Sequence, residues 1–116
     1  MEPIKNQPSY VAFIVEHLSA MGEITVKKLF GGHCLYCGGV VFALIARNTL
    51  YLKADSLNQP AFIEQGLKAF NPFDRPNGLM PYYTAPVEIF EDEDALKFWV
   101  GGAIQAGRRS KKAKKR

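Results

Sequence analysis

Residues 28 to 53 constrain the fold of this chain more than any other stretch. Their sequence is KLFGGHCLYCGGVVFALIARNTLYLK, in which two apolar runs, at 40–46 and 50–52, are separated only by Arg47-Asn48 and Thr49. Asn tolerates the positive φ that two-residue hairpin turns require. We therefore predict that the two runs form a tight antiparallel hairpin.

A third run of strand-forming residues, at 25–36, precedes this hairpin across the glycine pair at 38–39. We interpret the three runs as three antiparallel strands in a meander. The Phe-Gly-Gly at 30–32 falls inside the first of them, and paired glycines within a strand are typical of a bulge or a bend. We therefore expect an irregular first strand.

Helical periodicity appears at both ends of the chain. One apolar stripe repeats near the start, another follows the acidic run at 91–94, and a short helix with Pro60 in its first turn is expected between them. Acidic residues suit the positive end of a helix dipole. The two stripes consist of Val11, Ile14, Val15 and Leu18, and of Leu96, Trp99, Val100, Ala103 and Ile104.

Two further strands are predicted at 67–73 and 79–89, separated by the turn cluster DRPNG. Pro81 and Pro86 favour an edge position for the second of them. The predicted order is α-β-β-β-α-β-β-α. We expect a two-layer α+β domain, with an antiparallel five-stranded sheet and helices packed on one side.

Most of the positive charge lies at the end of the sequence. The net charge is +4, yet residues 108–116 hold seven of the fifteen basic residues and no acid. Without them, eight basic and eleven acidic residues leave a net charge of −3. We expect a domain at 1–107 and a disordered tail at 108–116 that contacts nucleic acid non-specifically or only aids solubility. The basic residues are Arg108, Arg109, Lys111, Lys112, Lys114, Lys115 and Arg116.

Cys34 and Cys37 form a C-x-x-C motif. Thioredoxin-type chemistry places such a motif at a helix start, and a zinc site needs about four ligands, for which His17 and His33 are the only histidines. Here the motif leads into Gly-Gly and a strand. We therefore favour two ordinary thiols and keep a redox or metal-binding protein as the alternative.

No catalytic constellation accompanies these residues, so we expect neither an enzyme nor a cofactor. Tyr36, Tyr82 and Tyr83 suit packing in the sheet better than stacking on bases, because few Lys and Arg lie between them. No apolar run approaches the roughly 20 residues that span a bilayer, and the first residues show no secretory pattern. We expect a cytoplasmic protein without a membrane anchor.

Four separated motifs resemble the N-terminal domain of the TfoX (Sxy) family of bacterial competence regulators, over about residues 9 to 107. The resemblance lies in the three runs KKLFGGHCLYCGGVVFALIARNTLYLKAD, PYYTAP and DEDALKFW, and the four motifs within them are residues 30–32, 41–45, 50–53 and 81–83. Its motif residues include Phe30, Gly31, Gly32, Tyr51, Lys53, Pro81, Tyr82 and Tyr83.

This resemblance implies an α+β domain without enzymatic activity that assists a transcription activator of the catabolite activator type. Full-length members carry a second, C-terminal domain, whereas this sequence continues only into the basic tail, so we expect a stand-alone N-terminal domain. The family's strand end usually lacks a C-x-x-C, which makes Cys34 and Cys37 peculiar to this chain. We expect a protein partner to dock on the meander or on an edge strand.

Overall fold

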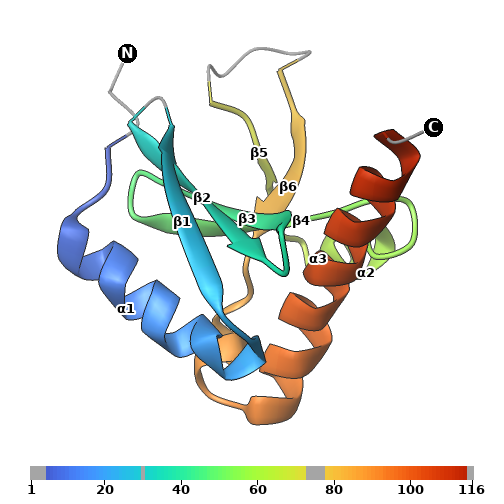
Figure 1. Ribbon diagram of the computed structural model, residues 1–116. Coiled ribbons are helices and arrows are strands. Elements are labelled where there is room, and N and C mark those ends of the chain that lie inside the picture. The colour runs from blue at the N-terminus through green and yellow to red at the C-terminus, as the bar shows by residue number, and fades with distance from the viewer. Residues whose placement is uncertain (1–4, 30, 73–77, 115–116) are drawn as a thin grey trace.

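The computed structural model in Figure 1 describes residues 5–29, 31–72 and 78–114. Three α-helices, two short 3₁₀ segments and six strands follow one another in these parts of the chain. In order they are α1 (Pro8–Leu18), η1 (Ser19–Met21), β1 (Ile24–Leu29), β2 (Gly32–Cys37), β3 (Val40–Ala46), β4 (Thr49–Lys53), α2 (Gln59–Glu64), β5 (Ala69–Phe70), β6 (Met80–Thr84), η2 (Val87–Phe90) and α3 (Glu93–Lys114).

The sheet is antiparallel, as predicted, but it has six strands in the order β1-β2-β3-β4-β6-β5 rather than five. The predicted strand at 25–36 is in fact two strands, β1 and β2, which pair from Ile24↔Cys37 to Leu29↔Gly32. Gly31 has φ 84°, so it supplies the positive φ that the hairpin turn needs. The Gly-Gly that we interpreted as a bulge or bend thus reverses the chain.

The hairpin predicted at Arg47-Asn48 is confirmed. These two residues have φ 51° and 56°, and Ala46 pairs with Thr49 on either side of them. The glycine pair at 38–39 forms an equivalent turn between β2 and β3, with φ 60° and 80°. Because these two short turns follow the β1–β2 hairpin, four consecutive strands lie next to one another in the sheet.

The prediction that the strand around Pro81 lies at an edge is wrong. β6 pairs with β4 on one side and with β5 on the other. The register with β5 shifts between the pairs Ala69↔Tyr83 and Phe70↔Met80, so Pro81 lies in an irregular part of the ladder. A bulge accommodates a residue that has no N–H to donate, which is why an interior strand tolerates this proline.

The three helices pack on one face of the sheet, which we call the helix face (Figure 1). Leu35, Ile45 and Leu52 point to it from neighbouring strands, and all three are fully buried. Ile14 of α1, Phe62 of α2 and the buried stripe of α3 complete this core. The fold is therefore a two-layer α+β domain.

The helix α3 continues to Lys114, whereas we predicted a disordered tail from residue 108. Contacts with the rest of the fold hold its last turns. Gly107 is so close to β3 that a Cβ built on it would lie 2.4 Å from the carbonyl oxygen of Val41. Arg109 forms an ion pair with Asp55, and Nζ of Lys111 donates to the carbonyl of Gly39 at 3.2 Å. Residues 115 and 116 lie outside the described residues.

Candidate functional site

Cys34 and Cys37 are both buried free thiols, and they lie on opposite faces of β2. Cys37 belongs to the core on the helix face, where its sulfur would lie 3.2 Å from a Cβ on Gly22. Cys34 pairs with Lys27 and Leu44 on the other face. Successive side chains of a strand alternate between faces, so residues three apart point in opposite directions. The two sulfurs therefore cannot share a metal ion or form a disulfide within this strand.

Burial also makes Cys34 a poor nucleophile. It raises the pKa of the Cys34 thiol, so less of the reactive thiolate is present at neutral pH. Within the described ranges, no group of three or more His, Cys, Asp or Glu residues is placed to hold a metal ion. The described geometry thus offers no support for the alternative of a redox or metal-binding protein.

The basic end of α3 projects from the fold as an ordered helix (Figure 1). Arg109 anchors it through two hydrogen bonds to the Asp55 carboxylate, one of them 2.9 Å long, and the guanidinium lowers the pKa of that carboxyl. Arg108 and Lys112, one turn apart, are exposed and make no ion pair with any residue that the structure describes. These two cations are available to an external anion.

The other basic residues near the end of the chain can also be sorted by whether they hold the helix against the domain. Lys111 is exposed but donates to the turn between β2 and β3, so it also helps to hold the helix. Lys114 is the last residue of α3. Lys115 and Arg116, which we also predicted to contact nucleic acid, lie outside the described residues. The structure thus separates cations that fix the helix from cations that face solvent.

The face of the sheet opposite the helices carries several of the family-motif residues, and we call it the tyrosine face. Its side chains come from neighbouring strands, and Leu44, Tyr51, Phe70 and Tyr82 among them pack in a small second cluster. Lys27 lies 5.5 Å from the ring centroid of Tyr36, and Lys53 lies 5.3 Å from that of Tyr82. They include Cys34, Tyr36, Leu44, Tyr51, Phe70 and Tyr82.

Other family-motif residues contribute to the packing, hydrogen bonds and turns of the fold. Tyr83 points to the helix face, where its ring stacks on Phe62 at 5.2 Å between centroids and its hydroxyl accepts from Gln59 at 2.8 Å. The carbonyl of Pro81 accepts from Ala54 at 2.9 Å. Gly31 and Gly32 belong to the first hairpin, and Phe30 lies outside the described residues. Tyr82 is only 7% exposed, so it packs in the sheet as predicted.

Asn6 ties the segment before α1 to two hairpins. Its Oδ1 accepts from the backbone N–H of Asn48 at 2.9 Å, and its Nδ2 donates to the carbonyl of Ile45 at 2.7 Å. The same Nδ2 lies 2.8 Å from Nδ1 of His33. The backbone of Gln7 adds a bond to Oδ1 of Asn48 at 2.7 Å. Among the described residues, no side chain caps α1, and the side chain of Asn6 bonds elsewhere.

These bonds determine the tautomer of His33. Because Asn48 and Ile45 fix which atom of the Asn6 amide is the nitrogen, Nδ2 must donate to Nδ1 of His33. The ring hydrogen is therefore on Nε2. No described residue accepts a hydrogen bond from Nε2, so this donor is free for a ligand.

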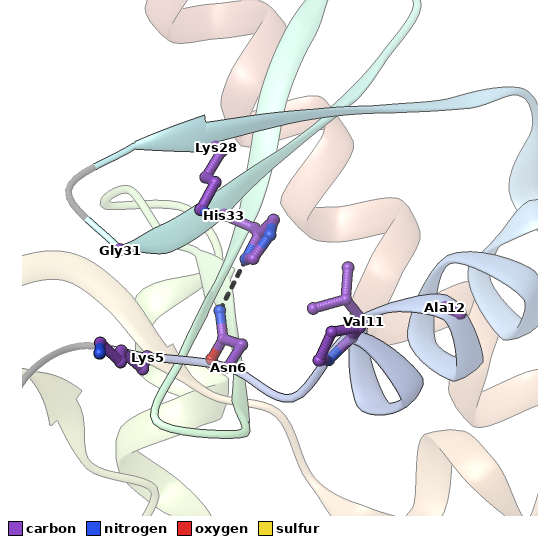
Figure 2. A pocket seen from close by; sticks show the side chains of 8 residues that line it. Lys5, Asn6, Val11, Ala12, Lys28, Gly31 and His33 are labelled. Carbon is purple, nitrogen blue, oxygen red and sulfur yellow. Dashed lines mark hydrogen bonds between the residues drawn. The ribbon is translucent and has the colours of Figure 1, made fainter.

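A pocket of about 580 Å³ lies beside this network (Figure 2). Lys5 and Asn6 line it from the segment before α1, Val11 and Ala12 from α1, and Lys28 and His33 from the β1–β2 hairpin. Lys28 and His33 are direct cross-strand partners, and Figure 2 shows them side by side. None of the described lining residues carries a carboxylate. The pocket is thus basic on one side and apolar on the other.

Our sequence interpretation missed this group of residues, although one signal was present. If the Phe-Gly-Gly at 30–32 had been interpreted as a turn, Lys28 and His33 would have been expected opposite each other. Asn6 offered no such signal, because its partners are 27 to 42 positions away.

The comparisons with known proteins agree with the fold. The sequence model of the TfoX N-terminal domain matches residues 16–107. No curated protein matches the chain. Among the described elements, no helix has both the length and the apolar character that crossing a membrane requires.

Proposed function

This chain belongs to the TfoX N-terminal domain family, and we propose that it is a non-catalytic regulatory domain that acts through a protein partner, with its basic helix end in contact with nucleic acid. The family match over residues 16–107 supports a regulatory domain. The observation that carries the nucleic-acid contact is the exposure of Arg108 and Lys112 at the end of α3.

The charge distribution supports a contact that is confined to this helix end. The rest of the sequence has more acidic than basic residues, so it repels a polyanion as a whole. Arg108 and Lys112 lie one helical turn apart, a spacing that presents both side chains on the same side of the helix. Arg109 and Lys111 hold this helix against the domain. The cations are therefore presented in a fixed position rather than on a mobile tail.

The experiment compares two double variants of the full chain that lose the same charge. Arg108→Gln with Lys112→Gln removes the two solvent-facing cations, whereas Lys68→Gln with Lys97→Gln removes two exposed cations elsewhere. Binding to a labelled DNA duplex is measured over a range of salt concentrations. We expect the first pair to weaken binding and to lower the slope of log K against log salt by about 2, because each phosphate contact contributes about 0.9. Equal slopes for the two pairs would refute a contact at this helix end.

The protein partner that we propose is a transcription activator, and we place its docking surface at the sheet edge formed by β1. Among the strands that the structure describes, β1 pairs only with β2, and its residues from Lys27 to Leu29 are exposed, Leu29 by 51%. An unpaired strand edge is a common surface for partner docking. A pull-down at physiological salt should recover the activator with the unaltered chain and not with Leu29→Lys. Recovery of no transcription component would count against the partner.

A further inference from the structure

We propose that the pocket between the segment before α1, the start of α1 and the β1–β2 hairpin binds a small organic phosphate. The phosphate group would lie between Lys5, Lys28 and His33, and the organic part would contact Val11 and Ala12. This site is separate from the basic end of α3 and does not depend on the function proposed above.

The pocket gathers hydrogen-bond donors from several side chains. Lys28 and His33 are cross-strand partners, so their Cβ atoms are about 5 Å apart and both side chains rise from the same place on the sheet. Asn6 occupies Nδ1 of His33 and leaves the Nε2 hydrogen as a donor. The ammonium groups of Lys5 and Lys28 add two charged donors. Three elements of the fold therefore contribute donors to one pocket.

The charge of the pocket suits a phosphate group. Lys5 and Lys28 make no ion pair with a described residue, and no described carboxylate lines the pocket. Two cations and one neutral donor match a phosphate monoester, which carries close to two negative charges and three terminal oxygens. A carboxylate offers one charge and two oxygens and would leave a donor unused. Charge-assisted hydrogen bonds of this kind are about twice as strong as neutral ones.

The volume of the pocket suits a ligand larger than phosphate alone. The pocket of about 580 Å³ exceeds what an inorganic phosphate fills and lies within the range of small-molecule sites. Val11 and Ala12 form its apolar side, opposite His33 in Figure 2. The hydrogen bonds of Asn6 hold the segment that carries Lys5 in place without a ligand. The site is therefore formed in advance.

The test titrates the isotopically labelled full chain with phenyl phosphate and follows the backbone amide signals. We expect saturable shifts at Lys28, Gly31 and His33. Lys28→Gln should weaken binding by about tenfold or more, because it removes a charge-assisted bond. Lys27→Gln is the matched control, since the neighbouring lysine points to the opposite face of the sheet. Equal weakening by the two variants, or no saturable shift at millimolar concentrations, would overturn the proposal.

His33 provides a second pair of variants. Gln keeps an N–H donor near the position of Nε2, whereas Leu removes it, so binding should survive in His33→Gln and fall in His33→Leu. Because the loss of Nδ1 affects Asn6 in both variants, a difference between them reports on the ligand rather than on the fold. Equal affinities of the two variants would contradict a role for Nε2.

Three other ligands define the chemical class. Benzoate should bind more weakly than phenyl phosphate, and equal binding would overturn the preference for phosphate. Inorganic phosphate should also bind more weakly, and equal binding would overturn the apolar contact. A DNA duplex that shifts the same amides and depends on Lys28 would assign the phosphate to nucleic acid instead of a small molecule. Arg108→Gln with Lys112→Gln should leave phenyl phosphate binding unchanged, so failure of either proposal is recognised separately.

Discussion

The two faces of the sheet bury apolar side chains in different ways. On the helix face, the three helices enclose a continuous core in which Phe42, Leu35 and Leu52 are fully buried. On the tyrosine face, the described buried cluster is small and consists of Ala46, Phe70 and Tyr82, with Leu44 and Tyr51 partly buried beside them, and Cys34 is also buried on this face. No described helix contributes to that cluster. The helix face therefore carries most of the stability of the domain, while the tyrosine face is shielded chiefly by the side chains of its own strands.

The largest loss of stability is expected when a phenylalanine side chain is truncated to alanine, and we compare one such substitution on each face. Phe42→Ala leaves an enclosed cavity under the helices and should cost about 3–5 kcal/mol. Phe70→Ala should cost about 1.5–3 kcal/mol, because solvent or neighbouring side chains can fill the thinner cluster and only the burial of the ring is lost. Urea unfolding measures both. Equal losses would show that the two faces stabilise the fold equally.

A smaller loss of stability is expected from a substitution where α3 packs on the sheet. Gly107→Ala places a methyl group 2.4 Å from the carbonyl of Val41, and the resulting displacement should cost about 1–3 kcal/mol. Gly102→Ala is the matched control, because the nearest atom to its Cβ is 3.8 Å away. That substitution should stabilise the helix by up to about 1 kcal/mol. A Gly107→Ala variant as stable as the unaltered protein would show that the helix end is not tightly packed on the sheet.

The smallest loss of stability at neutral pH is expected from removing the hydroxyl group of Tyr82 on the tyrosine face. Burial, with smaller contributions from Cys34 and Tyr36, raises the pKa of Tyr82 to about 12. The folded state therefore binds the phenolic proton more tightly than the unfolded state, where the pKa is about 10. The resulting stability is fully present below pH 10 and is lost as the pH rises to about 12.

Tyr82→Phe tests this linkage. The variant should change stability little at pH 7 and should lose less than the unaltered protein as the pH rises from 10 to 12. Absorbance titration should also lose the component near pH 12. If that component persists in Tyr82→Phe, another tyrosine is the source of the late titration.

The predictions that the structure confirms rest on residues that are close together in the sequence. Periodic apolar residues identified α1 and α3, and the Arg47-Asn48 turn identified the β3–β4 hairpin, since these features depend on neighbours only a few positions away. The Phe-Gly-Gly was misinterpreted because paired glycines suit a turn and a bulge equally well. The prediction of an edge strand at Pro81 failed because a bulge inside a sheet accommodates proline as readily as an edge does.

The candidate sites depended more on contacts between distant residues. The spacing of Cys34 and Cys37 already places them on opposite faces of any regular strand, so that conclusion was within reach of the sequence. The ordered end of α3 could not be predicted from the sequence in this way, because it depends on Asp55, 54 positions before Arg109, and on the backbone of β3. The same holds for Asn6, whose hydrogen bonds join three separate elements.

The contact at Gly107 also sets the rotational phase of the basic residues. Each residue added to an α-helix turns the following side chains by about 100°. With Gly107 held against Val41 of β3, a single residue inserted before Arg108 would swing Arg108 and Lys112 to another side of the helix axis. The direction in which this protein presents its charge is thus encoded by chain length as much as by residue type.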